Sequence, residues 1–220
     1  MTDEPLVMLL TNAVAANFTA NCLLAFGAKP AMVCEPSEAA ELAVHADALL
    51  VNLGTVTGEQ AAAMRQAIAV ANGKHVPWVL DPVGVQHLEF RRRLAIEFAA
   101  MKPAIIRGNA TEIAALADLA PTIADSTVLL ATDRIDKVRQ GTSVTEIAGG
   151  SSLLQAVTAT GCAQGAICAA FLGRGLPPHD AAIAASKLMK RAGELAQSQS
   201  PSPGSFQTAL IDAIWGLRHD

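Results

Sequence analysis

The chain has little of what nucleic-acid-binding proteins use. Its 220 residues include no tyrosine, and aromatic residues make up only 4%, so a base-stacking platform is excluded. The formal net charge is −4, and Arg91, Arg92 and Arg93 are the only basic triplet. A basic surface for nucleic acid is therefore not expected.

Membrane and secretion signals are also missing from the sequence. No apolar run reaches the roughly 18 residues of a membrane-spanning helix, and the acidic start "MTDEPLVMLL" lacks the basic residues of a signal peptide. The four cysteines, Cys22, Cys34, Cys162 and Cys168, show neither C-x-x-C spacing nor a histidine cluster. We expect reduced thiols in a cytoplasmic protein rather than disulfides or a zinc site.

The two common nucleotide-binding signatures are absent as well. Neither G-x-x-x-x-G-K-[ST] nor G-x-G-x-x-G occurs, which excludes a Walker loop and a Rossmann fingerprint. The hydrophobic content is high, at 51%. Length and composition together favour one α/β domain over 1–220 with a large core, rather than two small domains.

Short apolar runs alternate with longer, alanine-rich amphipathic runs in the first part of the chain. Strands are predicted at 6–11, 30–34, 48–54, 76–84 and 104–108, and helices at 14–27, 36–46, 57–73, 89–101 and 109–119. Ser37, Thr57 and Asn109 are the predicted N-caps, and Gly27 and Gly73 the predicted helix ends. This βαβ alternation predicts a mostly parallel sheet covered by helices on both faces.

The pattern changes in the second part of the chain. Strands joined by tight turns are predicted at 127–132, 136–141 and 144–149, and helices at 161–175, 178–197 and 206–217. The Ser/Pro-rich stretch 198–205 is predicted to be a loop, and it is too short to separate domains.

Polar residues follow several of the predicted parallel strands at their carboxyl ends. They are Gly54 and Thr55, Asp81, Arg107 with Asn109 and Glu112, and Thr132 with Asp133. The carboxyl ends of parallel strands share one edge of a sheet, where ligands bind. Carboxylates, an arginine and a helix N-terminus at this edge suit a polyanion held with a divalent metal.

The stretch "TATGC" (158–162) stands at the mouth of an apolar helix. The first amides of a helix have no partner within the helix and carry the positive end of its dipole. Ala159 and Gly161 would let a phosphate approach this backbone closely. Such a cradle stabilises charge on a transferring phosphoryl group.

At this point the sequence resembles the hydroxyethylthiazole kinase family, which has the ribokinase-like fold, a three-layer sandwich with a mostly parallel central sheet. The resemblance runs through "PLVMLLTNAVAANFTANCLLAFGAKPAM" (5–32), "ALLVNLGTVT" (48–57), "VLDPVGV" (79–85), "IIRGNATEIAAL" (105–116), "VTATGC" (157–162) and "PGSFQTAL" (203–210). It implies transfer of the γ-phosphate of ATP, with Mg²⁺, to the primary alcohol of 4-methyl-5-(2-hydroxyethyl)thiazole in thiamin salvage.

The resemblance also implies roles for particular residues. Substrate binding falls to Met32, Asn12, Asn17 and Ala159, ATP binding to Arg107 and Thr132, magnesium to Asp81 and Glu112, and the anion hole to Ala159, Thr160, Gly161 and Cys162. Family members are trimers with the thiazole pocket between neighbouring subunits, so a homotrimer is expected here.

Cys162 stands where most ribokinase-like proteins have an aspartate base. A thiol at a helix N-terminus is expected to have a lowered pKa, and its thiolate would accept the proton of the alcohol. Replacing Cys162 with aspartate is then expected to retain or raise the rate. Positioning and charge matter more than a strong base in the loose transition state of phosphoryl transfer.

Other interpretations of the same residues stay open. Cys162 and Met32 could be ordinary packing residues, Arg107 a structural ion-pair partner, and Glu112 the acid of a capping box. Ala159 and Asp133 stand where the family has glycine, and the segment between Glu112 and Thr132 is shorter than is usual. One alternative is therefore a catalytically impaired thiazole- or thiamin-binding relative. The other is a ribokinase-like kinase for hydroxymethylpyrimidine or a pyridoxine-type vitamer.

Overall fold

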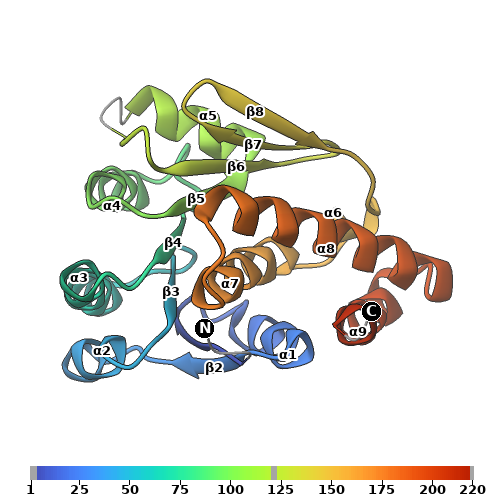
Figure 1. The fold of residues 1–220 in the computed structure, drawn as a ribbon, viewed down its shortest axis with the longest axis horizontal. Coiled ribbons are helices and arrows are strands. Elements are labelled where there is room, and N and C mark those ends of the chain that lie inside the picture. Colours follow the sequence, from blue (N-terminus) through green and yellow to red (C-terminus); the bar gives the residue numbers. More distant parts are fainter. Residues whose placement is uncertain (1–3, 120–122, 219–220) are drawn as a thin grey trace.

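A single eight-stranded sheet, in the order β2-β1-β3-β4-β5-β6-β7-β8, runs through the molecule in the computed structural model, which describes residues 4–119 and 123–218 (Figure 1). Its strands are β1 (Leu6–Leu10), β2 (Lys29–Met32), β3 (Ala48–Asn52), β4 (Trp78–Asp81), β5 (Ile105–Asn109), β6 (Val128–Thr132), β7 (Asp136–Gln140) and β8 (Ser143–Ile147). The strands from β2 to β6 pair in parallel, and β7 and β8 add antiparallel hairpins. The predicted change of pattern after β5 is thereby confirmed.

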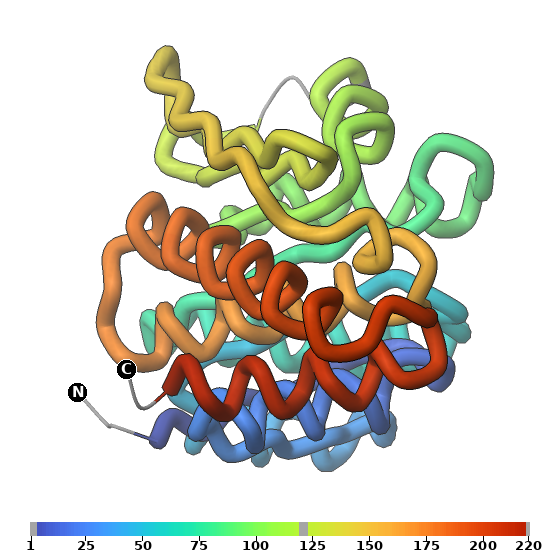
Figure 2. The backbone as a smooth tube through the Cα atoms, turned by 90° about the vertical axis from the view of Figure 1, so that its right-hand side faces the viewer, coloured from blue at the N-terminus to red at the C-terminus, as the bar shows by residue number. Residues whose placement is uncertain are grey.

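Helices cover both faces of this sheet. One face carries α1 (Ala16–Phe26), α7 (Thr160–Gly173), α8 (Pro178–Gln199) and α9 (Pro203–Leu217), and the other carries α2 (Pro36–Ala43), α3 (Gly58–Lys74), α4 (Glu89–Ala100) and α5 (Ala110–Leu119). Figure 2 shows α8 and α9 side by side with α1 beneath them. The predicted three-layer α/β sandwich is confirmed.

Strand periodicity divides the core between these two layers. Leu50, Val79 and Ile105 lie in the cluster under α1 and α7, whereas Leu49, Val51 and Leu80 lie in the cluster under α2–α4. Every residue of β3 is buried, as expected of a parallel strand covered on both faces. Because side chains alternate with a period of two, the residue that comes two positions after Leu50 or Val79 shares the α7 face.

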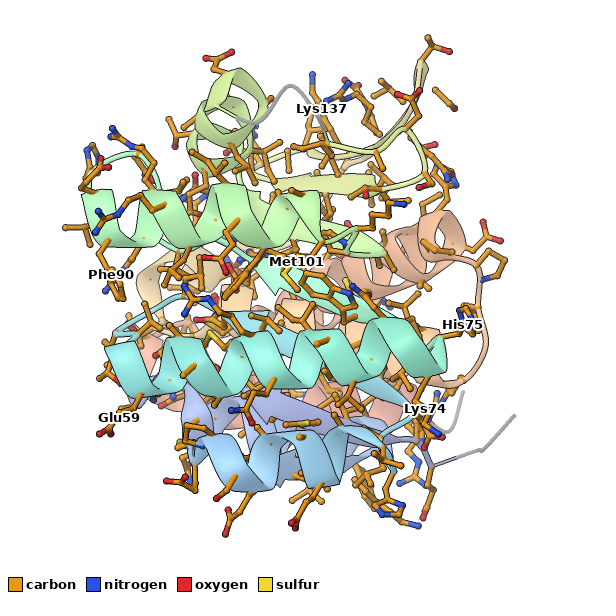
Figure 3. The ribbon with its side chains drawn as sticks, turned by 90° about the vertical axis from the view of Figure 1, so that its left-hand side faces the viewer. Glu59, Lys74, His75, Phe90, Met101 and Lys137 are labelled. Atoms are coloured by element: carbon orange, nitrogen blue, oxygen red, sulfur yellow. The ribbon has the colours of Figure 1, made fainter. Side chains whose placement is uncertain are left out.

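The helices that follow parallel strands begin near the same edge of the sheet. Figure 3 looks onto the α2–α4 layer, with Glu59 and Phe90 near the beginnings of α3 and α4, and His75 beyond the end of α3. The edge with the helix beginnings is the edge where the strands of the βα units end. The residues that follow those strands are therefore gathered there.

Several predicted helix ends are confirmed. Gly27 ends α1 in the left-handed conformation with φ 88°, and Thr57 forms a capping box with Gln60 at the start of α3. Asn109 caps α5 through its side-chain oxygen, which accepts from the Glu112 amide at 2.8 Å.

Other predicted boundaries are wrong. The cap of α2 is Glu35 rather than Ser37, because Pro36 starts the helix and the Glu35 carboxylate accepts from the Ser37 amide at 3.3 Å. Helix α3 continues through Gly73 and ends at His75, which takes a left-handed φ of 58°. The loop predicted over 198–205 shrinks to the few residues between Gln199 and Pro203.

One helix was not predicted. Helix α6 (Leu153–Ala156) has 4 residues, which is too short to show a helical period in the sequence. In the part of the chain that the structure describes, no helix combines the length and the apolar character needed to span a bilayer. All four cysteines have free thiols, as predicted.

Candidate active site

Polar residues at the carboxyl ends of β3, β4 and β5 face helix α7. Asn52, Asp81 and Arg107 come two positions after Leu50, Val79 and Ile105, which pack in the α7-side cluster. The parallel register pairs Asn52 with Asp81. Period-two alternation thus directs all three polar side chains at the first turns of α7. The predicted gathering of Asp81 and Arg107 is confirmed, and Asn52 joins them although it was not predicted.

Two asparagines form a directed chain of hydrogen bonds that leads to Asp81. The Asn12 side-chain oxygen accepts from the Ala15 amide at 2.9 Å, so its NH₂ group is free to donate to Asn52 Oδ1 at 2.9 Å. Asn52 Nδ2 then donates to Asp81 Oδ2 at 2.6 Å. The Gly54 amide also donates to Asn52 Oδ1, at 2.9 Å. The orientation of both side-chain amides follows from this chain, because the Asp81 carboxylate can only accept and the backbone amides of Ala15 and Gly54 can only donate.

Cys162, in the first turn of α7, contacts both asparagines of this series of hydrogen bonds. Its Sγ lies 3.2 Å from Asn52 Nδ2 and 3.5 Å from Asn12 Nδ2, and both amides donate to it. Burial and the nearby Asp81 charge raise the pKa of the thiol to about 11, against smaller effects of Arg107 and the two amides. The predicted lowering of this pKa by the helix N-terminus is wrong, because the thiol is shut in beside a carboxylate.

Asp81 is a fully buried carboxylate with an incomplete set of partners. Its Oδ1 has no hydrogen-bond partner, and its Oδ2 lies 3.8 Å from Arg107 Nη1. Burial raises the pKa of this carboxyl to about 6, and Glu112 adds to the rise, while Arg107 and Asn52 oppose it. A buried carboxylate that lacks partners is what a cation site needs.

Glu112 is held by backbone amides. Its Oε2 accepts from the Asn109 amide at 2.9 Å, which completes a capping box with Asn109, and its Oε1 accepts from the Gly84 amide at 2.9 Å. The structural interpretation of Glu112 is therefore confirmed, and each oxygen keeps a further lone pair.

A magnesium ion fits the two carboxylates near this edge. In proteins Mg²⁺ is usually held by one or two carboxylates together with substrate phosphates and water. Asp81 offers an oxygen without a partner, and Glu112 lies close enough to influence Asp81 electrostatically. Within residues 4–119 and 123–218, no group of three or more His, Cys, Asp or Glu side chains could hold a metal. Phosphates would have to complete the coordination.

A large cleft of about 1270 Å³ opens beside Arg107. Its walls include Arg107 and Thr132, residues 133–136, most of the segment 148–155 after β8, and Lys190 on α8. Arg107 Nη2 donates to Thr132 Oγ1 at 2.8 Å, so the two predicted ATP-binding residues lie together at the cleft. The size is ample for a nucleotide.

The N-terminus of α7 borders this cleft, because Thr160 and Gly161 line it and Cys162 follows them directly. The first helical hydrogen bond runs from the Ala163 amide to the Ala159 carbonyl, so the amides of 160–162 precede it and are free to bind an anion. Ala159 itself takes a left-handed φ of 71°. A Cβ added to Gly161 would collide with the Arg107 guanidinium, so any other residue there would displace that side chain.

The structure does not bring all the predicted site residues together. Thr160 and Gly161 line the cleft, but Met32, Asn12 and Asn17 do not. Met32 ends β2 with 42% of its surface exposed, and the exposed Asn17 accepts from Asn21 on α1 at 3.2 Å. Asn12 is buried beneath Cys162.

Sequence reasoning also missed a buried polar group at the cleft wall, made of Gln164, Asp136, Ser186 and Lys190, of which all but Ser186 line the cleft. A glutamine within the apolar run "GCAQGAICAAF" was the available signal for it.

The sheet order and this edge together define the class of protein. A ribokinase-like superfamily protein from Enterococcus faecalis superposes with a TM-score of 0.67, covering 95% of this chain and 86% of that chain at 11% identity. At that identity the likeness shows the fold alone, and the fold is ribokinase-like.

Closer relatives define the family. The model of the hydroxyethylthiazole kinase family matches residues 1–125 and 120–220. A hydroxyethylthiazole kinase from Akkermansia muciniphila is 43% identical over 235 residues, which covers 97% of this chain and 87% of that protein. The structure of a hydroxyethylthiazole kinase from Pyrococcus horikoshii superposes with a TM-score of 0.90 at 33% identity, over 97% of this chain and 88% of that one. The chain belongs to the hydroxyethylthiazole kinase family.

The two family matches meet within 120–125. This break lies in the segment between Glu112 and Thr132, which is expected from the sequence to be shorter than is usual in the family. The alignment with the Akkermansia protein also spans 235 positions, although the present chain has 220 residues. The alignment therefore contains gaps on the side of this chain.

Proposed function

We propose that this protein transfers the γ-phosphate of ATP to the primary alcohol of 4-methyl-5-(2-hydroxyethyl)thiazole, yielding the thiazole phosphate used in thiamin salvage. Membership of the hydroxyethylthiazole kinase family supports the activity. The observation that carries the proposal is the position of the α7 amides. The amides of 160–162 have the Arg107 guanidinium, which lines the cleft, on one side and the Cys162 thiol on the other.

ATP would occupy the cleft with its phosphates towards Arg107 and Thr132. The Arg107 guanidinium neutralises phosphate charge, and the amides of 160–162 take up the charge that develops during transfer. Asp81 and Glu112 would hold Mg²⁺ with the phosphates, and the ion would neutralise part of their charge. The desolvated Asp81, with its free Oδ1, supports this assignment.

Cys162 would act mainly by orienting the alcohol. Because burial and Asp81 raise the pKa of this thiol to about 11, it is almost entirely protonated at neutral pH. Proton abstraction by a thiolate is therefore a small contribution, which a loose phosphoryl-transfer transition state tolerates. Asn12 and Asn52 hold the sulfur in place by donating to it.

The thiazole half of the site is proposed to form between subunits of a homotrimer. Met32 and Asn17 are assigned to the thiazole, with Ala159 at its hydroxyethyl arm and Asn12 behind Cys162. Met32 and Asn17 are exposed and lie outside the cleft, so a second surface is needed to enclose the ring.

The free thiols support a reducing, cytoplasmic location.

Phosphorus NMR of the purified protein with Mg-ATP and hydroxyethylthiazole tests the activity. We expect a new phosphomonoester signal that requires both substrates and the protein. A parallel panel with hydroxymethylpyrimidine and pyridoxine distinguishes the other vitamin kinases. Phosphorylation of one of these in preference to the thiazole would contradict the proposed substrate.

Two observations favour a catalytically impaired thiazole-binding relative as the second candidate. Ala159 holds a left-handed conformation that L-residues avoid, and Asp133 places a carboxylate on the cleft wall where it would repel phosphates. Calorimetry distinguishes this candidate. Thiazole binding without Mg-ATP binding would support it and would contradict the kinase.

A further inference from the structure

Gln164 is a buried polar residue on the apolar helix α7. Only 5% of its surface is exposed. It lies three residues after Gly161, so both face the same side of the helix. That side meets Arg107, whose guanidinium occupies the space next to the Gly161 backbone.

The two ends of the Gln164 amide contact two different charged groups. Its Nε2 donates to Asp136 Oδ2 at 3.2 Å, and its Oε1 accepts from Arg107 Nη2 at 3.4 Å. A carboxylate can only accept and a guanidinium can only donate. The amide therefore has one favourable orientation, with its oxygen towards Arg107.

Arg107 has few other groups that could fix its guanidinium. Nη2 donates to Thr132 Oγ1, Nη1 lies 3.8 Å from Asp81 Oδ2, and the buried Nε has no hydrogen-bond partner. A long side chain with few partners retains rotamer freedom, and fixing that freedom before a ligand binds improves affinity. The Gln164 oxygen restricts the same Nη2 that Thr132 contacts.

Asp136, which accepts from Nε2 of Gln164, is itself held by several partners. Ser186 Oγ donates to its Oδ2 at 2.6 Å, the Asp133 amide donates to its Oδ1 at 3.1 Å, and Lys190 Nζ lies 3.2 Å from Oδ1. Lys190 balances the charge of the carboxylate. It also donates to the carbonyls of Asp133, Arg134 and Gly149, which belong to the cleft wall.

We infer that Gln164 is a positioning residue, which holds the Arg107 guanidinium in its phosphate-binding orientation and ties it through Asp136 and Lys190 to the wall of the nucleotide cleft. This inference rests on the proposed function, because it assigns Arg107 to the phosphates of ATP. It specifies how that arginine is held.

Replacing Gln164 with methionine tests the inference, since methionine keeps the length of the side chain and loses both hydrogen bonds. We expect the Kd and KM for Mg-ATP to rise about tenfold, the effect of losing one hydrogen bond to a charged group. The KM for the thiazole and the affinity for AMP, which lacks the β- and γ-phosphates, are expected to stay within about twofold. Titration calorimetry and initial rates measure these quantities.

Gln140→Met is the matched control. It makes the same exchange on β7 at a glutamine that donates to the Ser126 carbonyl and does not line the cleft, and its Mg-ATP affinity is expected to stay within about twofold of the wild type. In an Arg107→Met background, Gln164→Met is expected to add no further loss of ATP affinity. Gln164→Asn, which is too short to reach both partners, replaces the methionine variant if that variant does not fold.

The outcomes separate this inference from the proposed function. Equal Mg-ATP affinity in the wild type and the Gln164 variant, or equal losses for ATP and AMP, would overturn the role of Gln164 alone. A wild-type protein that binds ATP but does not phosphorylate the thiazole would overturn the proposed function alone. Absence of ATP binding to the wild type would overturn both.

Discussion

At the scale of single residues, the base role of Cys162 can be tested by exchange with aspartate. The amides of Asn12 and Asn52 that donate to the sulfur would also donate to a carboxylate, whose pKa lies below that of a thiol in the same surroundings. We expect the kcat of Cys162→Asp to equal or exceed that of the wild type. Initial rates with Mg-ATP and the thiazole measure this.

The pH profile of the wild type supplies the control. If the thiolate were the working base, kcat would rise tenfold per pH unit up to the thiol pKa of about 11. We expect a nearly flat kcat above about pH 8, because orientation and charge dominate. A folded but inactive Cys162→Asp protein, or a kcat that keeps rising with pH, would contradict the assignment of Cys162 as a residue that mainly orients the alcohol.

Asp81 is expected to lower the stability of the fold at neutral pH. In the folded chain this carboxyl has a pKa of about 6, whereas in the unfolded chain it has the ordinary pKa of 3.8. The unfolded chain therefore loses this proton at a pH about two units lower. The unfolded chain therefore binds fewer protons between these values, so stability falls as the pH rises through them. Burial is the largest cause of the shift and outweighs the attraction of Arg107.

The Asp81→Asn variant should accordingly be more stable than the wild type by about 1–3 kcal/mol at pH 7. The difference should vanish by about pH 3, where the wild-type carboxyl is protonated in the folded and the unfolded chain alike, and the variant should lose most of its activity. Urea unfolding at the two pH values measures this, with the exposed Asp212→Asn as control. Destabilisation of Asp81→Asn at pH 7 would show instead that the pairing with Arg107 dominates.

At the scale of elements, the start of α7 carries a local conflict between stability and function. Ala159 adopts φ 71° and ψ −1°, which costs an L-residue about 1–2 kcal/mol, whereas glycine adopts this conformation freely. Ala159→Gly is expected to stabilise the protein by about 0.5–1 kcal/mol, after subtraction of the greater unfolded-state entropy of glycine. It is also expected to raise kcat, because the amides of 160–162 become more accessible.

Ala163→Gly is the matched control for that exchange. It lies in the same helix and is completely buried, so glycine there should destabilise by at least about 1 kcal/mol. Chemical denaturation and initial rates compare the two variants. Equal destabilisation by both would contradict a strained Ala159. An unchanged rate in Ala159→Gly would show that the methyl group does not obstruct the site.

At the scale of the whole molecule, one domain over 1–220 is a prediction that unfolding can test. The two hydrophobic clusters lie on opposite faces of the same sheet, so neither can persist without the strands that they share. The chain has two tryptophans. Trp78 on β4 is 1% exposed and Trp215 on α9 is 53% exposed, so they report on different layers.

Trp215→Phe and Trp78→Phe each leave one tryptophan as the reporter. We expect the fluorescence midpoint to coincide with the circular dichroism midpoint within each variant. A midpoint for Trp215 that differs from that of the secondary structure would mean that α9 and its neighbours unfold separately.

The sequence by itself determined the order of the elements other than α6, the mixed sheet and the edge at which we propose that ligands bind. Strand and helix periodicity, caps such as Thr57 and Asn109, and the βαβ alternation are local features, so they can be seen without coordinates. The predicted gathering of Asp81, Arg107 and Thr132 followed from the rule that parallel strands end at one edge. The ends of α2 and α3 were mispredicted because Glu35 and His75 are unusual terminal residues.

Only the tertiary structure decided the chemistry at that edge. Cys162 meets Asn52 and Asn12 across 110 and 150 residues of chain, and their amides cannot outweigh the burial that raises the pKa of its thiol. The amide of Gln164 likewise acquires its orientation from Arg107 and Asp136, which lie on separate strands. Desolvation and hydrogen-bond direction depend on what surrounds an atom in space, and sequence spacing does not contain that information.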